Sequence, residues 1–219
     1  MADIAVIDYG MGNLRSVAKA IEHVAPGRTV CVTDDPLEVE RAGRVVFPGQ
    51  GAMPDCMREL DARGLRSAVM AAAANKPFLG ICIGLQMLFE RSEEGDVPGL
   101  GLFHGRVRRF SAASMVDAAG ARLKVPHMGW NRVRQLRAHP LWDGIEDGAR
   151  FYFVHSYYVD TADQALVTGE SDYAHPFTCA IARDNVFAVQ FHPEKSAAAG
   201  LRLLANFVGW QAVGGGDGR

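Results

Sequence analysis

A cysteine flanked by glycines is the part of this sequence best suited to chemistry. Residues 80–84 read Gly-Ile-Cys-Ile-Gly, with a short apolar stretch before them and an apolar-periodic segment, 85–89, after them. This order is typical of a strand, a sharp turn and a helix, with the central residue presented at the turn as a nucleophile. Free N–H groups at the head of the helix would stabilise the Cys82 thiolate. The same residues also fit a buried core cysteine, and the pattern alone leaves both interpretations open.

His192 and Glu194 are the partners that a cysteine nucleophile requires. They follow the apolar run 186–189 and are separated only by Pro193. At the end of a strand, the imidazole can take the thiol proton while the carboxylate fixes the ring tautomer. Taken alone, these residues favour an exposed turn with a solvated glutamate. Together with Cys82, they predict cysteine-dependent catalysis.

A glycine-rich loop supplies a third element of such a site. Gly49, Gln50 and Gly51 come directly after the apolar run 45–47 and Pro48. Acyl transfer from an amide develops negative charge on oxygen, and backbone N–H groups stabilise that charge. A glycine loop can bring its N–H groups close to a substrate. Without the other two segments, an ordinary strand-to-helix turn would be the better interpretation.

The elements expected around these segments alternate between strand and helix in the first half of the chain. Such alternation predicts an α/β fold with a mostly parallel central sheet and helices on both faces. Expected strands are 4–7, 30–33, 44–47 and a short one before Gly80, and expected helices are 14–24, a short turn at 36–39, and 57–74.

The second half is richer in short strands. They are expected at 106–108, 132–134, 151–159, 178–182 and 186–191, followed by a last helix over about 197–211. This pattern predicts a β-rich antiparallel extension of the sheet. We expect one domain over residues 1–212 and a flexible glycine-rich tail over 213–219.

The three segments, in this order, closely resemble the motifs of class I glutamine amidotransferases. Residues 48–51 match the family's Pro-Gly-x-Gly loop, 80–86 its nucleophile motif and 192–194 its His-x-Glu. The resemblance runs from about residue 4 to residue 210. It implies hydrolysis of the glutamine side-chain amide, without a metal or organic cofactor, and transfer of the ammonia to a synthase partner.

The resemblance also implies roles for individual residues. Cys82 would attack, His192 would transfer protons and Glu194 would hold His192. Backbone N–H groups would stabilise the oxyanion at Ile83, Gly49, Gln50 and Gly51. The groups that grip the glutamine would be Gln86, His155, Ser156 and Tyr157.

Three further segments, 8–16, 126–131 and 151–158, resemble the glutaminase subunits of imidazole glycerol phosphate synthases, which belong to histidine biosynthesis. This resemblance implies a heterodimer with a (β/α)₈-barrel cyclase subunit. Gln50 stands where many amidotransferases have a further glycine, so a flipped backbone is costly and we expect the oxyanion loop to rest in an inactive form. The residues expected nearest the partner are Asn13, Lys124, His127 and Trp130. A glutaminase subunit of another synthase, a related hydrolase and a non-catalytic binding subunit stay open as alternatives.

The composition limits the class of protein and the cellular compartment that fit this chain. The 219 residues carry a formal net charge of −2 and are 48% hydrophobic, which favours a globular chain without a nucleic-acid-binding surface. No apolar run approaches the ~20 residues of a membrane span, and no secretory signal is seen. The four cysteines form no C-x-x-C pair and no zinc spacing. We therefore expect a reduced, cytoplasmic protein with no metal.

Overall fold

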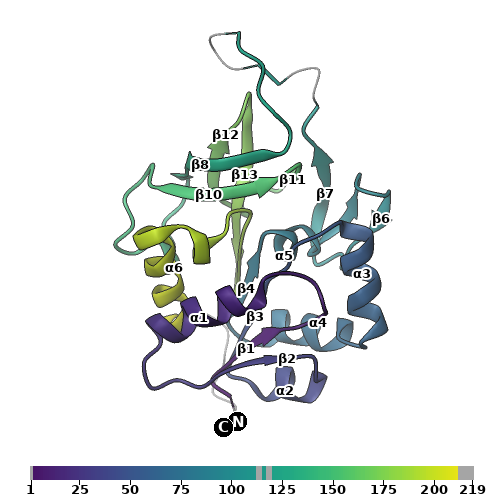
Figure 1. Cartoon of the computed structure of the whole chain (residues 1–219), viewed down its shortest axis with the longest axis vertical. Helices are drawn as coiled ribbons and strands as arrows, with labels where there is room; N and C mark the ends of the chain where they lie inside the picture. Colours follow the sequence, from purple (N-terminus) through teal and green to yellow (C-terminus); the bar gives the residue numbers. More distant parts are fainter. Residues whose placement is uncertain (1, 112–114, 117–119, 212–219) are drawn as a thin grey trace.

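The computed structural model describes residues 2–111, 115–116 and 120–211. Five neighbouring parallel strands form one half of its large sheet (Figure 1). The expected parallel arrangement is therefore confirmed. Side by side, these strands are β2 (Val30–Thr33), β1 (Ile4–Ile7), β3 (Arg44–Phe47), β4 (Phe78–Ile81) and β14 (Val186–Val189).

Helices cover both faces of this sheet because its strands are apolar on both sides. Successive side chains of a strand point to opposite faces. Ile4 and Val6 accordingly belong to one apolar cluster, and Ala5 and Ile7 to the other. The first cluster lies under α1 (Leu14–Val24) and α6 (Ala197–Gly209); the second lies under α2 (Pro36–Arg41), α3 (Met53–Ala62) and α4 (Arg66–Asn75).

The single helix expected over 57–74 is wrong. The structure has two helices there, α3 and α4, and the first begins at Met53. Between them Gly64 has φ +67° and its N–H bonds the carbonyl of Asp61 at 3.0 Å. A left-handed residue of this kind ends a helix, and glycine adopts it without a steric penalty.

An antiparallel extension widens the sheet beyond β14, as expected. Among the described strand pairs in it, only β5–β7 is parallel. The nucleophile helix α5 (Ile83–Gln86) is shorter than the apolar periodicity suggested, because strand pairing begins again at Phe89. The extension consists of β13 (Pro176–Arg183), β11 (Tyr157–Asp160), β7 (Phe103–Arg109), β5 (Phe89–Ser92) and β6 (Val97–Pro98), with β12 (Val167–Asp172) and β9 (Arg134–Gln135) beside β13.

A separate two-stranded sheet lies across the upper part of the molecule in Figure 1. It pairs β8 (His127–Arg132) with β10 (Arg150–His155) in antiparallel register, with His127 directly opposite His155. The one strand expected over 151–159 is therefore two, divided at Ser156, because β10 joins this small sheet and β11 joins the large one. Short 3₁₀ turns occur at η1 (Pro140–Trp142) and η2 (Pro193–Lys195).

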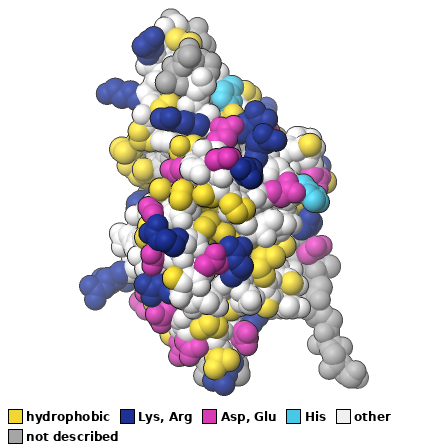
Figure 2. All heavy atoms as spheres, turned by 90° about the vertical axis from the view of Figure 1, so that its right-hand side faces the viewer, with side chains coloured by type: hydrophobic (Ala, Val, Ile, Leu, Met, Phe, Trp, Pro, Cys, Tyr) yellow, Lys and Arg dark blue, Asp and Glu magenta, His cyan; other side chains and the backbone are white. Residues whose placement is uncertain are grey.

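Charges of both signs are interspersed on the face shown in Figure 2 rather than gathered by sign. Several of the described charges form exposed ion pairs, such as Arg66 with Asp61 and Arg91 with Asp96, both at 2.7 Å. No helix in the described part of the chain is long and apolar enough to span a membrane. The tail expected over 213–219 lies outside the described residues.

Candidate active site

Cys82 occupies a sharp turn between β4 and α5. Its backbone has φ 57° and ψ −111°, a region that a residue with a side chain adopts only under constraint. The flanking glycines are needed for packing rather than for their own dihedral angles. A Cβ on Gly84 would lie 1.9 Å from the carbonyl oxygen of Phe47, and one on Gly80 would lie 2.9 Å from the Ala188 side chain. The elbow is thus pressed against β3 and β14, which fixes where the thiol points.

His192 and Glu194 meet at the end of β14. The His192 Nδ1 atom lies 2.9 Å from Glu194 Oε1, and both side chains are almost fully buried. The backbone holds the histidine as well, since its N–H bonds the Tyr152 carbonyl at 2.9 Å and its carbonyl accepts from the Ser196 hydroxyl at 2.6 Å. The ring is therefore fixed in position and orientation before any substrate arrives.

The charge state of His192 follows from its neighbours. Burial by itself lowers the pKa of His192, because it disfavours the imidazolium. The charge and hydrogen bonding of Cys82, followed by those of Glu194, outweigh burial and raise the pKa of His192 to about 10. Beside a Cys82 thiolate, the ring is therefore an imidazolium at neutral pH. That is the form that stabilises a neighbouring thiolate and can later release a proton to a leaving group.

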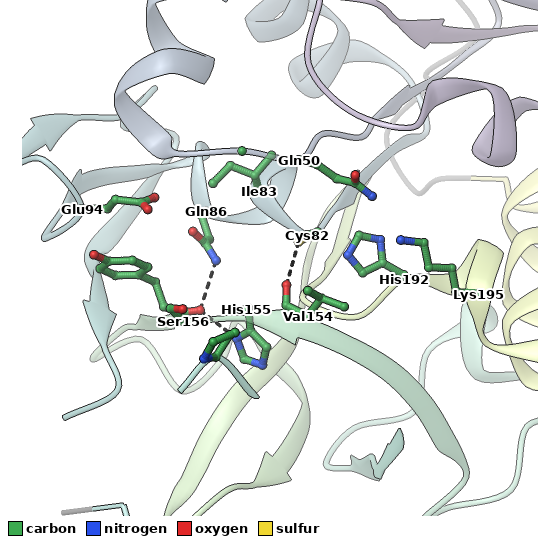
Figure 3. Close-up of a pocket in the computed structure, with 13 residues that line it drawn as sticks. Gln50, Cys82, Ile83, Gln86, Glu94, Val154, His155, Ser156, His192 and Lys195 are labelled. Carbon is green, nitrogen blue, oxygen red and sulfur yellow. Dashed lines mark hydrogen bonds between the residues drawn. The ribbon is translucent and has the colours of Figure 1, made fainter. Parts of the chain in front are cut away.

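A cavity of about 350 Å³ opens beside Cys82 and gathers most of the expected residues. Glu194 lies behind His192, and Gly49 lines a small adjoining space of about 10 Å³ with Asn13 and Glu194. We call the side that carries Cys82 and His192 the nucleophile wall. We call residues 154–157, where β10 ends and β11 begins, the substrate wall; the two face each other in Figure 3. The expected residues that line the cavity are Cys82, His192, Gln50, Gly51, Ile83, Gln86, His155, Ser156 and Tyr157.

The expected oxyanion loop is packed closely from behind. A Cβ on Gly49 would lie 1.7 Å from the Tyr9 hydroxyl, so only glycine fits there. Gly51 has φ +122°, whereas Gln50 does not have a positive φ. Cys56 donates its thiol to the Gln50 carbonyl at 3.8 Å. The unusual backbone angle therefore falls on the glycine after Gln50 and not on Gln50 itself.

Gln86 is used mainly inside the protein. Its amide nitrogen donates to the Tyr157 carbonyl at 3.1 Å and to Gln190 Oε1 at 3.0 Å. Those bonds occupy both amide hydrogens, and Gln86 is only 3% exposed. Only its Oε1 atom is left to accept a hydrogen bond from a substrate. Gln86 thus joins the two walls of the cavity.

Gln190 is a site residue that the sequence analysis missed. It is fully buried, and its amide nitrogen donates to Cys82 Sγ at 3.7 Å. Its signal was present, because a polar residue stands two positions before His192 at the end of an apolar strand. Two other lining residues, Glu94 and Lys195, lie outside every segment singled out from the sequence, whereas Pro126 and Val154 lie within the segments 126–131 and 151–158.

His155 also has its ring engaged within the protein. Its Nδ1 atom lies 2.8 Å from the Tyr157 carbonyl oxygen, and its Nε2 atom lies 2.9 Å from Nδ1 of His127. Burial lowers the pKa of His155 to about 3 and that of His127 to about 4. Both rings are therefore neutral at physiological pH.

The residues expected at the partner surface divide into two groups. Asn13, Lys124 and Trp130 are exposed, with Trp130 at 50%. His127, in contrast, is only 4% exposed, because its ring stacks between Tyr173 and Phe153. The expectation that His127 presents its side chain on the surface is therefore corrected. Within the described ranges, no group of three or more His, Cys, Asp or Glu side chains could hold a metal ion.

Comparison with known proteins agrees with this geometry. The family described as Glutamine amidotransferase class-I matches residues 5–209. The chain is 71% identical over 210 residues to the imidazole glycerol phosphate synthase subunit HisH of Aromatoleum aromaticum, covering 96% of this chain and 99% of that protein. It is 59% identical over 210 residues to the subunit of the same name from Nitrosomonas europaea, with coverage of 96% and 99%.

Solved structures share the fold at lower identity. The structure of PurLQS from Thermotoga maritima matches with a TM-score of 0.68 at 19% identity, covering 95% of this chain and 99% of that chain. The glutaminase domain of Trypanosoma brucei CTPS with bound acivicin matches with a TM-score of 0.63 at 18% identity, covering 97% and 96%. The chain belongs to the class I glutamine amidotransferase family. Within that family, it groups with the HisH subunits of imidazole glycerol phosphate synthase.

Proposed function

We propose that this chain is the glutaminase subunit of an imidazole glycerol phosphate synthase. It hydrolyses glutamine to glutamate and ammonia and supplies the ammonia to a cyclase partner in histidine biosynthesis. The observation that carries this proposal is one cavity that brings Cys82 together with the buried His192, whose ring lies 2.9 Å from Glu194. The names of the relatives, at 71% and 59% identity over nearly the whole chain, support the choice of synthase.

The first half of the reaction forms a thioester. The Cys82 thiolate attacks the side-chain amide carbon of glutamine, and a C–S bond forms as the carbonyl becomes an oxyanion. His192 then gives its proton to the departing nitrogen. The C–N bond breaks and ammonia leaves. Glu194 keeps the imidazole oriented and stabilises its charge throughout.

The second half hydrolyses the thioester. The neutral His192 takes a proton from water, and the resulting hydroxide attacks the thioester carbon. The C–S bond breaks, glutamate is released and the thiolate–imidazolium pair is restored. No co-reactant besides water is required.

Backbone N–H groups are proposed to stabilise the oxyanion in both halves. Ile83 begins α5, and the first N–H groups of a helix have no partner within it. The second donor would come from the loop Gly49, Gln50 and Gly51. This loop lies beside Ile83, since Gln50 and Ile83 are neighbours in Figure 3 and a Cβ on Gly49 would lie 2.5 Å from the Ile83 side chain. Glutamine itself would be held by Ser156 and Tyr157, with Gln86 contributing only its oxygen.

The proposed partner is a (β/α)₈-barrel cyclase that forms a heterodimer with this chain in the cytoplasm. Exposed apolar side chains on β8 support a docking surface there, since Met128 is 62% and Trp130 50% exposed. Large apolar and aromatic side chains of this kind are common at the centres of interfaces. Lys124 and Asn13 are further candidates for this surface. The outer hollow beside Met128 and Trp130 measures about 630 Å³.

A labelled-substrate assay tests the proposal. Glutamate formation would be measured with the purified chain alone, with a cyclase subunit, and with that subunit and its ligand. Glutamine labelled with ¹⁵N at the amide would show whether the nitrogen enters the cyclised product. We expect hydrolysis to be slow alone and fast in the loaded complex. Equal rates in all three conditions would contradict the coupling, and absence of hydrolysis in all three would contradict the proposed activity.

A further inference from the structure

A line of hydrogen bonds connects the outer strand β8 to the substrate wall. The amide nitrogen of Asn131 lies 3.3 Å from Nε2 of His127. Nδ1 of His127 lies 2.9 Å from Nε2 of His155, the residue directly opposite on β10. Nδ1 of His155 lies 2.8 Å from the Tyr157 carbonyl oxygen. Side chains on two strands thus connect to a backbone group beside the cavity.

The groups at the two ends of this line determine which atom donates and which accepts in each of its hydrogen bonds. The Tyr157 carbonyl can only accept, so His155 carries its proton on Nδ1. The neutral ring then accepts at Nε2, which places the His127 proton on Nδ1 as well. His127 Nε2 in turn accepts from the amide of Asn131. Every donor therefore faces an acceptor, but only when both histidines are neutral and in the Nδ1–H form.

Asn131 is itself held in the orientation that this direction requires. Its amide nitrogen also donates to the Asp172 carbonyl at 2.7 Å. Its Oδ1 atom accepts from the Arg132 N–H at 2.8 Å. These bonds distinguish the nitrogen from the oxygen of the amide, because one partner can only accept and the other can only donate. At the outer end of the line, Asn131 therefore presents its amide N–H to His127 and can only donate there.

The inner end lies where the substrate wall must be rigid. The Tyr157 carbonyl accepts hydrogen bonds from both His155 and Gln86. Gln86 also donates to Gln190, and Gln190 in turn donates to Cys82 Sγ. Ser156, which lines the cavity, stands between His155 and Tyr157 at the point where the chain leaves the small sheet for the large one. A shift of this carbonyl would move both Ser156 and Gln86.

We propose that Asn131, His127 and His155 act as positioning residues, holding the Ser156–Tyr157 segment in the geometry that binds glutamine. The inference rests on the proposed hydrolysis of glutamine. It adds Asn131 and His127, which do not line the cavity, and it assigns His155, which does, a positioning role. Their effect is expected on substrate binding, because the segment they hold is the one proposed to bind the part of glutamine that does not react. Losing the line raises KM for glutamine more than it lowers kcat.

Two substitutions of His127 separate hydrogen bonding from packing. The ring stacks on Tyr173 at 4.0 Å between centroids and on Phe153 at 4.9 Å. His127→Phe keeps an aromatic ring in this stack but removes the donor to His155. His127→Asn removes the ring but keeps an N–H near the position of Nδ1. His127→Phe therefore lacks the hydrogen bond to His155 but keeps the ring stack, whereas His127→Asn keeps the hydrogen bond but lacks the stack.

The two His127 variants are compared by their steady-state kinetics with the cyclase partner and by their thermal unfolding. We expect His127→Phe to lose about tenfold or more in kcat/KM, chiefly through KM, although it is the more stable variant. His127→Asn should keep most of kcat/KM in spite of a lower Tm. Activity that follows Tm instead, with His127→Phe the better enzyme, would show that the histidine only packs and would overturn the proposal.

Histidine tautomers give a second readout that does not depend on activity. Long-range ¹H–¹⁵N spectra of the labelled wild-type chain should show His127 and His155 as neutral Nδ1–H rings. An Nε2–H ring at either position would overturn the proposed direction. Failure of the wild-type complex to hydrolyse glutamine would count against the proposed function alone, since the tautomers would still decide the inference. Normal wild-type hydrolysis with equal kcat/KM in both His127 variants would count against the inference alone.

Discussion

The two walls of the cavity are built by different means. The nucleophile wall consists of short sequence segments at the ends of parallel strands, where Cys82 follows β4 and His192 follows β14. The substrate wall is a crossing between two sheets, and side chains distant in sequence hold it, including Gln86 and His127. A local motif can specify a turn and a nucleophile. Holding a strand crossing takes a buried polar network, which depends on the whole fold.

This difference predicts that substitutions on the nucleophile wall stop the chemistry, whereas those on the substrate wall weaken binding. The largest effect is expected from Cys82→Ala, which should abolish glutamine hydrolysis and leave the fold intact. The measurement is glutamate formation together with a circular dichroism spectrum. Synthesis by the partner from added ammonia should survive and serves as the control. Residual turnover above the blank in clean protein would mean that another group attacks.

Within the nucleophile wall, the proton carrier should matter more than the group that orients it. His192→Asn should lower kcat by about 10²–10⁴-fold, since it removes direct proton transfer. Glu194→Gln should cost less, because the amide can still hold the ring although it no longer offsets the imidazolium charge. Single-turnover rates with glutamine compare the two. Similar losses in both variants would show that these roles are wrongly divided.

The glycines of the elbow should show that the nucleophile wall is held by packing. Gly84→Ala places a methyl group against the Phe47 carbonyl and should lower the free energy of unfolding by about 1–3 kcal/mol. Gly209→Ala is the matched control at the end of α6, where a Cβ meets nothing within 4 Å. It should stay within about 1 kcal/mol of wild type. Urea denaturation measures both, and equal stability of the two variants would rule out the tight contact.

The charge state of His192 can be followed by its ¹⁵N shifts as pH is raised. In the wild-type chain the ring should stay protonated through neutral pH and titrate near pH 10. In Cys82→Ala the pKa should fall, because burial still lowers it while the contributions of the thiolate are gone. Glu194 would still raise the pKa of His192, although by less than Cys82 and Glu194 do together. A pKa that does not change on loss of the thiol would mean that Cys82 and His192 are not paired.

The smallest effect is expected at the loop that closes the cavity. Gln50→Gly removes the cost of a flipped backbone at this position. We expect faster hydrolysis by the chain alone and a smaller ratio of stimulated to unstimulated rate. The assay compares both rates with and without the partner and its ligand. An unchanged ratio would show that backbone cost at Gln50 does not limit the resting enzyme.

The features that sequence alone determined are those with short-range causes. The parallel core followed from alternating apolar runs, and α6 followed from its helical periodicity to within two residues. Cys82, His192 and Glu194 could be chosen because glycines, proline and neighbouring apolar runs mark the ends of strands. Each of these signals acts within about ten residues of the chain, so it is visible without the fold.

Tertiary structure decided the features that depend on distant partners. His127 looked like a surface residue beside Trp130, but opposite pairing with His155 turned it inward and made it neutral. Gln86 looked like a substrate ligand, but its amide hydrogens bond Tyr157 and Gln190. Buried polar side chains must find partners, and which partners they find depends on strand pairing across the whole chain.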